Sequence, residues 1–165
     1  EILPINNGAS FFKTLNNEDV RFKFITDSFF IKDTIISISE NKRISINLSK
    51  IEPGNREIQS NLIFEKSSTK LNEESLPYLN DLLHIFKNNI NVKITIEGHT
   101  DNSGSLKNNI RLSKERAEFI KGFLVKNGIK KGQIKVKGYG PTRPKFSNDS
   151  EELRVKNRRV EIYIN

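Results

Sequence analysis

The sequence predicts an α+β protein in which one sheet carries its helices on one face, in the order β-α-β-α-β-(α)-β, preceded by a small β-rich N-terminal region. Two observations lead to this prediction. Within residues 58–165, short segments alternate apolar and polar residues, and between them lie longer segments whose apolar residues recur every three or four positions. The first pattern is typical of strands and the second of helices. A single sheet with its helices on one face buries both.

The composition is that of a globular protein held together by its core. Of the 165 residues, 35% are apolar and 29% are charged, so disorder of the whole chain is not expected. The sequence contains no cysteine, which excludes a disulfide framework, a thiol nucleophile and a thiolate metal site. Apolar runs such as Phe29-Phe30-Ile31 are far shorter than the roughly 20 residues that cross a bilayer, so we expect any membrane anchor to lie outside this chain.

Charge is distributed unevenly along the chain. Residues 1–57 hold 8 Lys+Arg and 8 Asp+Glu, whereas residues 58–165 hold 20 and 12, so the net charge of +8 belongs to the second part. This shift, together with Pro53-Gly54, predicts a β-rich N-terminal region or linker of unknown role over 1–57 and a separate domain over 58–165. A basic domain attracts polyanions, although lysines scattered over a solvated surface are the plainer explanation.

The N-terminal region contains two alternating segments. One holds Val20, Phe22 and Phe24, and the other runs from Ile44 to Leu48, which predicts a small β unit. The opening stretch, 1–17, contains turn formers and no clear period, so we expect a linker or arm there.

In the second part, we first expect a strand over 57–64 and then a helix from about Ser75. Ser75 suits the N-cap position, and Pro77 falls in the first turn, where its missing N–H does no harm. The apolar stripe of this helix is expected to contain Leu79, Leu82, Leu83, Phe86 and Ile90.

The next strand is predicted over 92–97, with one buried face and one solvent face, and it ends at Gly98. A longer helix follows from Ser105 or Leu106 to Lys126, with Asn127-Gly128 as its C-terminal stop. Its core-facing residues are expected to be Ala117, Ile120, Phe123 and Leu124. A strand at 134–136, a loop over 138–144, a short helix at 151–156 and a last strand at 160–164 complete the order.

Two charged residues frame the most informative segment. Asp101 lies just past a predicted strand end, and Arg116 lies about three turns into the following helix, at the edge of its apolar stripe. The two side chains are predicted to flank one shallow pocket with a negative and a positive end, which suits a zwitterion such as the free end of an amino acid. The N-terminal N–H groups of the helix would favour the ionised Asp101. Asn109 would hydrogen-bond the ligand or tie down the loop.

The segment Gly98-His99-Thr100-Asp101, the helix pattern Asn109-x-x-Leu112-Ser113-x-x-Arg116-Ala117 and the late run Asn157-Arg158-Arg159-Val160-Glu161 together resemble the signature of the OmpA-like peptidoglycan-binding family. The resemblance covers about residues 58–165. It implies that Asp101 and Arg116 hold the amino and carboxylate groups of the stem-peptide diamino acid, diaminopimelate or another. Thr100, Asn109 and Arg158 are the supporting contacts that it implies.

Two positions depart from the family pattern. Glu65 stands where the family often has an Asp after the Phe of its first strand, so its reach toward a ligand differs. The segment 138–141 reads Gly-Tyr-Gly-Pro where the family often has Gly-x-Gly-Glu, so the contacts of this loop are expected to differ.

The resemblance implies a non-catalytic protein without a cofactor, which tethers the outer membrane or an envelope complex to the cell wall from the periplasm. No nucleic-acid partner is expected, and membrane contact is expected only through an anchor outside this chain. A homo-oligomer and an envelope-protein partner for residues 1–57 are left open.

Other interpretations apply to the same residues. His99 and Asp101 lack a third ligand at a suitable spacing, so no metal site is expected. Ser103, His99 and Asp101 lie too close in sequence for a catalytic triad. The main rival is a basic polyanion- or nucleic-acid-binding domain, motivated by a pI of about 9.7. Arg158 or Arg159 also has a purely structural interpretation, the bracing of a carboxylate such as Asp101 or Glu97.

Overall fold

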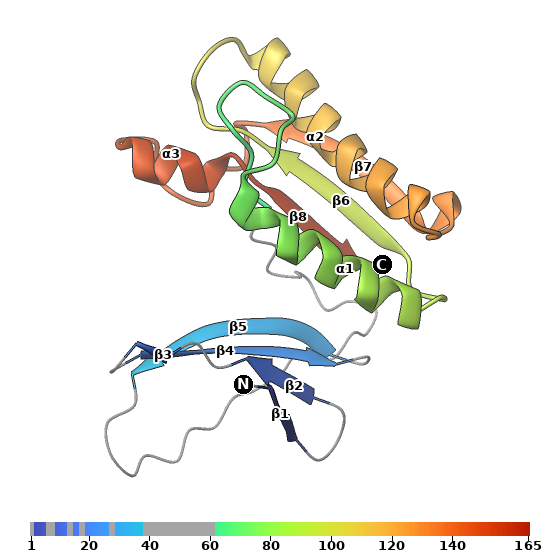
Figure 1. Cartoon of the computed structure of the whole chain (residues 1–165). Coiled ribbons are helices and arrows are strands. Elements are labelled where there is room, and N and C mark those ends of the chain that lie inside the picture. Colours follow the sequence, from blue (N-terminus) through green and yellow to red (C-terminus); the bar gives the residue numbers. More distant parts are fainter. Residues whose placement is uncertain (1, 6–8, 13–14, 17–18, 27–28, 38–61) are drawn as a thin grey trace. The chain divides into compact units, whose positions relative to one another are not determined.

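The structure is a computed structural model that describes residues 2–5, 9–12, 15–16, 19–26, 29–37 and 62–165, with side chains described in the last range. The chain divides into two compact units, Glu1–Glu52 and Pro53–Asn165, and each is described by itself (Figure 1). Within these ranges, none of the helices combines the length and apolar character that crossing a membrane requires.

The N-terminal unit contains antiparallel strands. They are β1 (Ile2–Ile5), β2 (Ala9–Phe12), β3 (Leu15–Asn16), β4 (Asp19–Thr26) and β5 (Phe29–Ser37). The sheet order is β1-β2-β4-β3, and β5 also pairs with β4. The predicted β unit is therefore confirmed around Val20 to Phe24, whereas the second alternating segment, 44–48, lies outside the described residues.

The expectation of a linker or arm over 1–17 is wrong. β1 and β2 pair with each other, with Ile2 opposite Phe12 and Ile5 opposite Ala9. Each of these strands is only four residues long, so alternation is too brief to be seen in the sequence. The turn formers at 6–8 stand between these two paired strands in the sequence.

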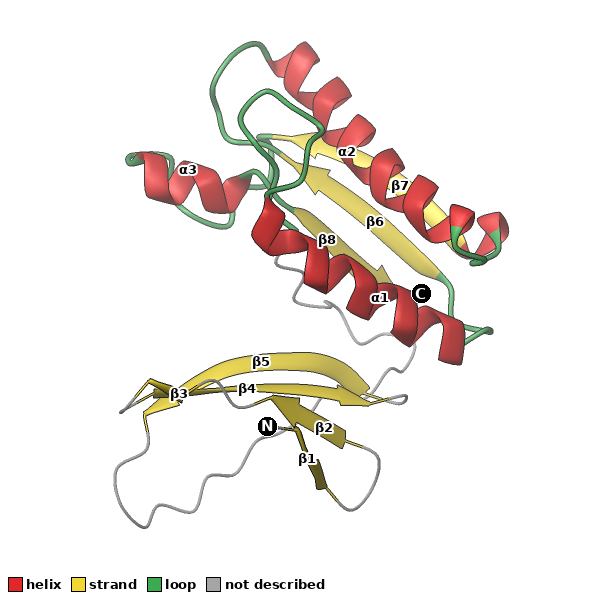
Figure 2. Cartoon of the chain, in the orientation of Figure 1, coloured by secondary structure: helices red, strands yellow, loops and turns green. Residues whose placement is uncertain are grey.

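After the expected first strand, the C-terminal unit has the predicted element order. Its elements are α1 (Leu76–Asn88), β6 (Ile94–His99), α2 (Leu106–Lys126), β7 (Ile134–Gly140), α3 (Glu151–Asn157) and β8 (Val160–Ile164), with short 3-10 helices at 73–75 and 131–133. β6 is the central strand, parallel to β7 and antiparallel to β8 (Figure 2). Because α1 and α2 lie on the same face of this sheet, the predicted fold class is confirmed (Figure 1). Of the expected first strand, the described end forms two isolated pairs, Ile63 with Arg159 and Phe64 with Leu71.

The helices bury most of the residues that their patterns indicated. Leu79, Leu82 and Phe86 of α1 are buried, as are Ala117, Ile120 and Leu124 of α2. The assignment of Ile90 to the stripe is wrong, because α1 ends at Asn88 and Ile90 is 65% exposed. Leu83 and Phe123 are half-buried.

β6 has no solvent face, contrary to prediction. Thr95 and Glu97, the polar residues of its alternating pattern, are both buried. Since β6 is central, neighbouring strands and the adjoining loop supply polar partners: Thr95 Oγ1 donates to Asn165 Oδ1 at 2.9 Å, and Lys137 Nζ lies 3.5 Å from a carboxylate oxygen of Glu97. Ion pairing allows a carboxylate to be buried in such a position.

Ser75 precedes α1 as expected but does not cap it. Its hydroxyl accepts a hydrogen bond from the backbone N–H of Ile63 at 3.0 Å, which ties the helix start to the preceding segment. Asn72 caps the short 3-10 helix that precedes α1. Its side chain accepts a hydrogen bond from Glu74 N.

The N-terminal half of α2 lies directly on two glycines of the sheet. A Cβ on Gly98 would come 1.8 Å from the carbonyl oxygen of Ser113, and one on Gly138 would come 2.6 Å from Lys114 N. Gly140 N donates to Ser113 Oγ at 2.9 Å, so β7 continues through residues that we expected to be loop. This close approach places the first three turns of α2 over the ends of β6 and β7.

We expect Gly98→Ala to lower the free energy of unfolding by about 3 kcal/mol, because the added methyl group overlaps the α2 backbone. Gly122→Ala is the matched control, since Gly122 is exposed on α2 and a Cβ added there would meet nothing within 4 Å. It should raise stability by roughly 0.5 to 1 kcal/mol. Urea unfolding followed by circular dichroism measures both, and a Gly98→Ala protein as stable as wild type would contradict the packing.

Candidate functional site

The strand directions bring the predicted site residues to one edge of the sheet. Because β6 and β7 are parallel and β8 is antiparallel to them, the ends of the first two meet the start of the third. Thr100 and Asp101 directly follow β6, and Arg158 lies two residues before β8. Thr100 N donates to Gly140 O at 3.0 Å, which fixes the start of the loop against the end of β7.

Helix α2 and the turn after Phe64 complete the site. The five predicted residues, Thr100, Asp101, Asn109, Arg116 and Arg158, all line one pocket, which we call the Asp101 pocket. Four further lining residues were not predicted: Lys66, Ser67, Ser103 and Leu112. The free volume is about 20 Å³, which is room for roughly one water molecule.

The carboxylate of Asp101 is buried and accepts two hydrogen bonds. Arg158 Nη1 donates to Oδ2 at 2.9 Å, and the backbone N–H of Ser103 donates to Oδ1 at 2.8 Å. Burial by itself would raise the pKa of Asp101, but the hydrogen bonds from Arg158 and Ser103 outweigh it and hold the pKa below its ordinary value. Asp101 is therefore an anion at neutral pH.

The side chain of Arg116, expected at the edge of the helix stripe, is fully buried. Its guanidinium donates to three backbone carbonyls: Nε to Ser68 O at 2.9 Å, Nη2 to Glu65 O at 2.8 Å and Nη1 to His99 O at 3.3 Å. It also lies over the ring of Phe64, 5.2 Å from the centroid. Arg116 thus fastens the turn at 65–68 to the end of β6.

Arg116 remains a cation in this environment. Burial and then the nearby Arg158 cation lower its pKa to about 10, although the Asp101 carboxylate acts in the opposite direction. A buried charge of this kind is tolerated when polar groups surround it, and the three carbonyls supply them.

Arg158 braces Asp101, as the structural interpretation of this residue expected. Its Nη1 also donates to Glu151 Oε1 at 2.9 Å. Burial would lower the pKa of Arg158, but hydrogen bonds to Asp101 and Glu151 raise it above its ordinary value. Two buried atoms of the pocket, Arg158 Nε and Thr100 Oγ1, have no hydrogen-bond partner among the described residues. Buried polar groups without a partner are rare and call for an explanation such as a ligand.

Asn109 ties down the loop, one of its two expected roles. Its Nδ2 donates to Ser103 O at 2.9 Å, which holds the loop that carries Asp101 against α2. Ser105 caps this helix by accepting from Asn108 N. The loop is therefore fixed before any ligand binds.

Glu65 does not line the pocket. Its carboxylate pairs with Lys70 at 2.8 Å on the surface, and only its carbonyl group takes part, by accepting from Arg116. The neighbouring Ser67 does line the pocket and has a positive φ of 52°, which is uncommon for a residue other than glycine. The sequence signal for this turn was the polar run 65–68 directly after Phe64.

The side chain of His99 does not line the pocket either. Its ring stacks on Tyr139 with 5.7 Å between centroids, and its Nε2 lies 3.4 Å from Glu161 Oε2. Among the residues that the structure describes, no group of three His, Asp or Glu side chains could hold a metal ion.

The pKa of Asp101 generates a pH prediction. Because the folded protein holds this pKa below that of the unfolded chain, about 3.9, the carboxylate contributes stability above pH 4 that is lost as the pH falls through the lower folded value. We expect Asp101→Asn to cost about 2 kcal/mol at pH 7, on the scale of a charge-assisted hydrogen bond. The difference should shrink below about pH 4.

Urea unfolding of both proteins between about pH 3.5 and pH 7 measures this difference. Asp149→Asn, which removes an exposed carboxylate, is the control. A cost of Asp101→Asn that stays constant or grows on acidification would contradict the assignment.

Comparison with known proteins gives consistent matches. The sequence model of the OmpA family matches residues 63–158. The peptidoglycan-associated lipoprotein of Buchnera aphidicola subsp. Baizongia pistaciae is 30% identical over 148 residues, 90% of this chain and 82% of that protein. The peptidoglycan-binding protein ArfA of Mycobacterium tuberculosis is 45% identical over 73 residues, 44% of this chain and 22% of that protein. Among solved structures, the C-terminal domain of Helicobacter pylori MotB has a TM-score of 0.58 at 31% identity, covering 63% of this chain and 82% of that one.

For several other curated relatives, the match covers only part of the relative's length, between 12% and 57%. The shared part is the one that holds the site, since the family match includes every predicted pocket residue from Thr100 to Arg158. On the family match and the Buchnera relative, the chain belongs to the OmpA family.

Proposed function

We propose that this chain binds peptidoglycan non-covalently and tethers an envelope component to the cell wall, with the Asp101 pocket holding the diamino acid of the stem peptide. One observation carries the proposal: a buried carboxylate and two buried guanidinium groups line a single pocket. Relatives named as peptidoglycan-associated lipoprotein and peptidoglycan-binding protein support this ligand.

Asp101 has capacity left for an ammonium group. A carboxylate offers about four lone-pair positions, and the bonds from Arg158 and Ser103 use two of them. The remaining positions accept hydrogen bonds from the ammonium end of the diamino acid. Thr100 Oγ1, which has no described partner, adds a further acceptor beside them.

The two arginines have donors left for a carboxylate. Arg116 has five N–H groups, of which its contacts use one on each nitrogen, so one remains on Nη1 and one on Nη2. Arg158 keeps its Nε–H, which is buried and without a described partner. Planar guanidinium groups bind carboxylates by two parallel hydrogen bonds, so the ligand carboxylate is placed between these donors.

The pocket has to widen for this ligand. Its free volume of about 20 Å³ is smaller than the end of an amino acid. Lys66, Ser67 and Ser103 are its exposed lining residues. Displacement of the Lys66 and Ser67 side chains opens the pocket without disturbing the buried Arg116.

The expected affinity for one stem is modest. Charge-assisted hydrogen bonds contribute roughly 1.5 to 3 kcal/mol each, whereas a micromolar dissociation constant requires about 8 kcal/mol. Firm attachment therefore relies on many stems on one polymer and on several protein copies in one membrane. Each single contact stays reversible.

The proposed place of the chain is the periplasm, in association with the outer membrane or the cell envelope. Relatives named peptidoglycan-associated lipoprotein, outer membrane porin F and cell wall anchor of the T6SS support this location.

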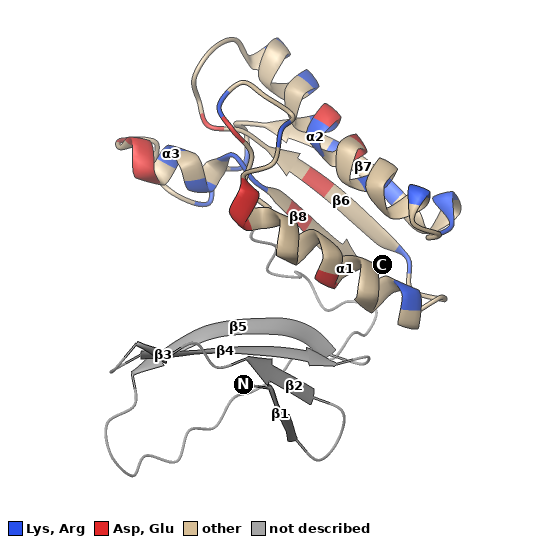
Figure 3. Ribbon diagram, viewed as in Figure 1, with Lys and Arg blue, Asp and Glu red and all other residues tan. Residues whose placement is uncertain are grey.

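A second candidate is attraction to polyanions in general, favoured by the net charge of +8. Figure 3 shows Lys and Arg along α2 toward its C-terminal end and at the start of β7. Lys126, Lys130 and Lys131 lie in that region, at the opposite end of a 21-residue helix about 30 Å long from the Asp101 pocket. The two functions can therefore be separated by mutation.

The test is sedimentation of the protein with purified sacculi that contain diaminopimelate. We expect Asp101→Asn to weaken binding by at least about tenfold, since it removes the charge that faces the ligand ammonium. Asp149→Asn, which has the same charge change on an exposed surface, should bind as wild type does. Free diaminopimelate should compete with the sacculi, and walls that contain lysine in its place should bind more weakly.

Replacement of Lys126, Lys130 and Lys131 by Gln tests the second candidate. Under the proposal this variant pellets normally. If it loses binding while Asp101→Asn retains it, and if binding falls steeply with salt, polyanion attraction is the correct explanation. Circular dichroism of each variant establishes that it is folded.

A further inference from the structure

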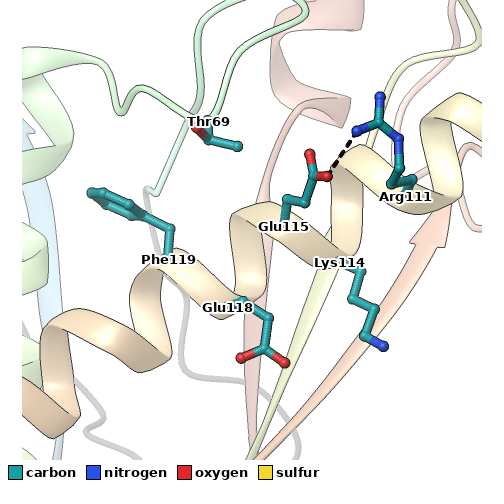
Figure 4. A pocket seen from close by; sticks show the side chains of 6 residues that line it. All are labelled: Thr69, Arg111, Lys114, Glu115, Glu118 and Phe119. Carbon is teal, nitrogen blue, oxygen red and sulfur yellow. Dashed lines mark hydrogen bonds and ion pairs between the residues drawn. The ribbon is translucent and has the colours of Figure 1, made fainter.

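A second hollow lies beside the Asp101 pocket on α2. It has a volume of about 590 Å³ and is lined by Thr69, Arg111, Lys114, Glu115, Glu118 and Phe119. Figure 4 shows the ring of Phe119 extending from the helix toward the segment that carries Thr69. We call this hollow the Phe119 groove. Its size falls within the range of small-molecule sites, roughly 300 to 1,000 Å³.

Phe119 presents an aromatic surface to the groove. The side chain of Phe119 is 46% exposed, although α2 packs other apolar side chains into the core. Its ring meets the buried ring of Phe64 edge to face, at 84° and 6.4 Å between centroids, so this packing leaves much of Phe119 uncovered. The ring is thereby held in place and still available to a ligand.

The same two elements line the groove and the Asp101 pocket, although the two hollows share no lining residue. Lys66 and Ser67 of one turn line the pocket, and Thr69 of the same turn lines the groove. On α2, Leu112 lines the pocket and Phe119 the groove, a separation of seven residues or about 10 Å along the axis. A stem in which two residues separate the diamino acid from the sugar spans a similar length, about 10 Å when extended.

The charges around the groove favour an uncharged ligand. Arg111 and Glu115, one turn apart on α2, form an ion pair of 2.9 Å along the rim, drawn as a dashed line in Figure 4. Lys114 and Glu118 add one charge of each sign, so the rim is balanced overall. An acidic peptide or an anionic lipid surface would be drawn to an excess of positive charge. A neutral polyol needs only hydrogen-bonding groups, which this rim supplies.

We infer that the Phe119 groove binds the sugar of the glycan strand from which the stem peptide hangs. The C–H face of a pyranose ring packs on the negative face of the Phe119 ring, and Thr69 and the charged rim hydrogen-bond its hydroxyl groups. This inference rests on the proposed binding of the stem by the Asp101 pocket. It extends recognition from the diamino acid to the saccharide at the other end of the stem.

The test compares two soluble probes on the whole chain by isothermal titration calorimetry. One is the stem tripeptide that ends in diaminopimelate, and the other is the same tripeptide attached to the N-acetylglucosamine–N-acetylmuramic acid disaccharide. Wild type should bind the second probe more tightly. Phe119→Leu should weaken the affinity for the disaccharide probe about fivefold, on the scale of an aromatic contact. It should leave the affinity for the tripeptide unchanged.

Two further variants keep the outcome interpretable. Phe119→Trp retains an aromatic face and should bind the disaccharide probe at least as tightly as wild type does. Leu106→Ala removes another exposed apolar side chain of the same helix, away from the groove, and should bind both probes normally. Thermal unfolding of each variant checks that it is folded.

The two proposals fail in different ways. If wild type binds neither probe, the proposed function itself is wrong. If wild type binds both probes equally and Phe119→Leu changes neither, the stem site stands and the saccharide inference is overturned. If Phe119→Leu weakens both probes equally, the groove takes peptide. If it only changes self-association in analytical ultracentrifugation, the groove is a contact between copies of the chain, and either result overturns the inference.

Discussion

The buried guanidinium of Arg116 is the interaction on which the site depends. A cation at 0% exposure is costly to bury unless polar groups compensate it, and the carbonyls of Glu65, Ser68 and His99 do so. These carbonyls belong to two segments, the turn at 65–68 and the end of β6. The same contacts that make the charge tolerable therefore hold the pocket wall together. In the proposed function, Arg116 both joins the two segments of the pocket wall and binds the ligand.

Close packing of the α2 backbone on the sheet positions Arg116. Gly98 and Gly138 let α2 approach the sheet until its backbone touches theirs, and Ser113 Oγ then accepts from Gly140 N. Asn109 and Arg116 lie one turn before and one turn after Ser113 on the same helix face, so the same approach positions both. The opposite edge of the pocket is equally fixed, since Asp101 is held by Arg158 and by the backbone of its own loop. In a site assembled in this manner, the buried groups are already in place, and under the proposed function only the exposed side chains of Lys66 and Ser67 have to move when the ligand binds.

Local patterns sufficed for the helices and the central strand of the C-terminal unit and for five of the nine residues that line the pocket. The periodicity of apolar residues located α1, α2 and the central strand. The family motif identified the five lining residues that were predicted. Properties that depend on neighbours distant in sequence were not accessible. The burial of Glu97 follows from its central strand, and that of Arg116 from carbonyls 48 and 51 residues away. Ser67 and Lys66 escaped prediction because a turn of exposed polar residues has no period.

A crystal structure of the chain with bound diaminopimelate would decide whether the Asp101 pocket holds the diamino acid. We expect the ligand ammonium to lie within about 3 Å of Asp101 and its carboxylate to lie at the free N–H groups of Arg116 and Arg158. Lys66 and Ser67 should have moved, while Arg116 keeps its three carbonyl contacts. A ligand ordered elsewhere on the chain, or an Asp101 pocket that excludes diaminopimelate at saturating concentration, would contradict this assignment.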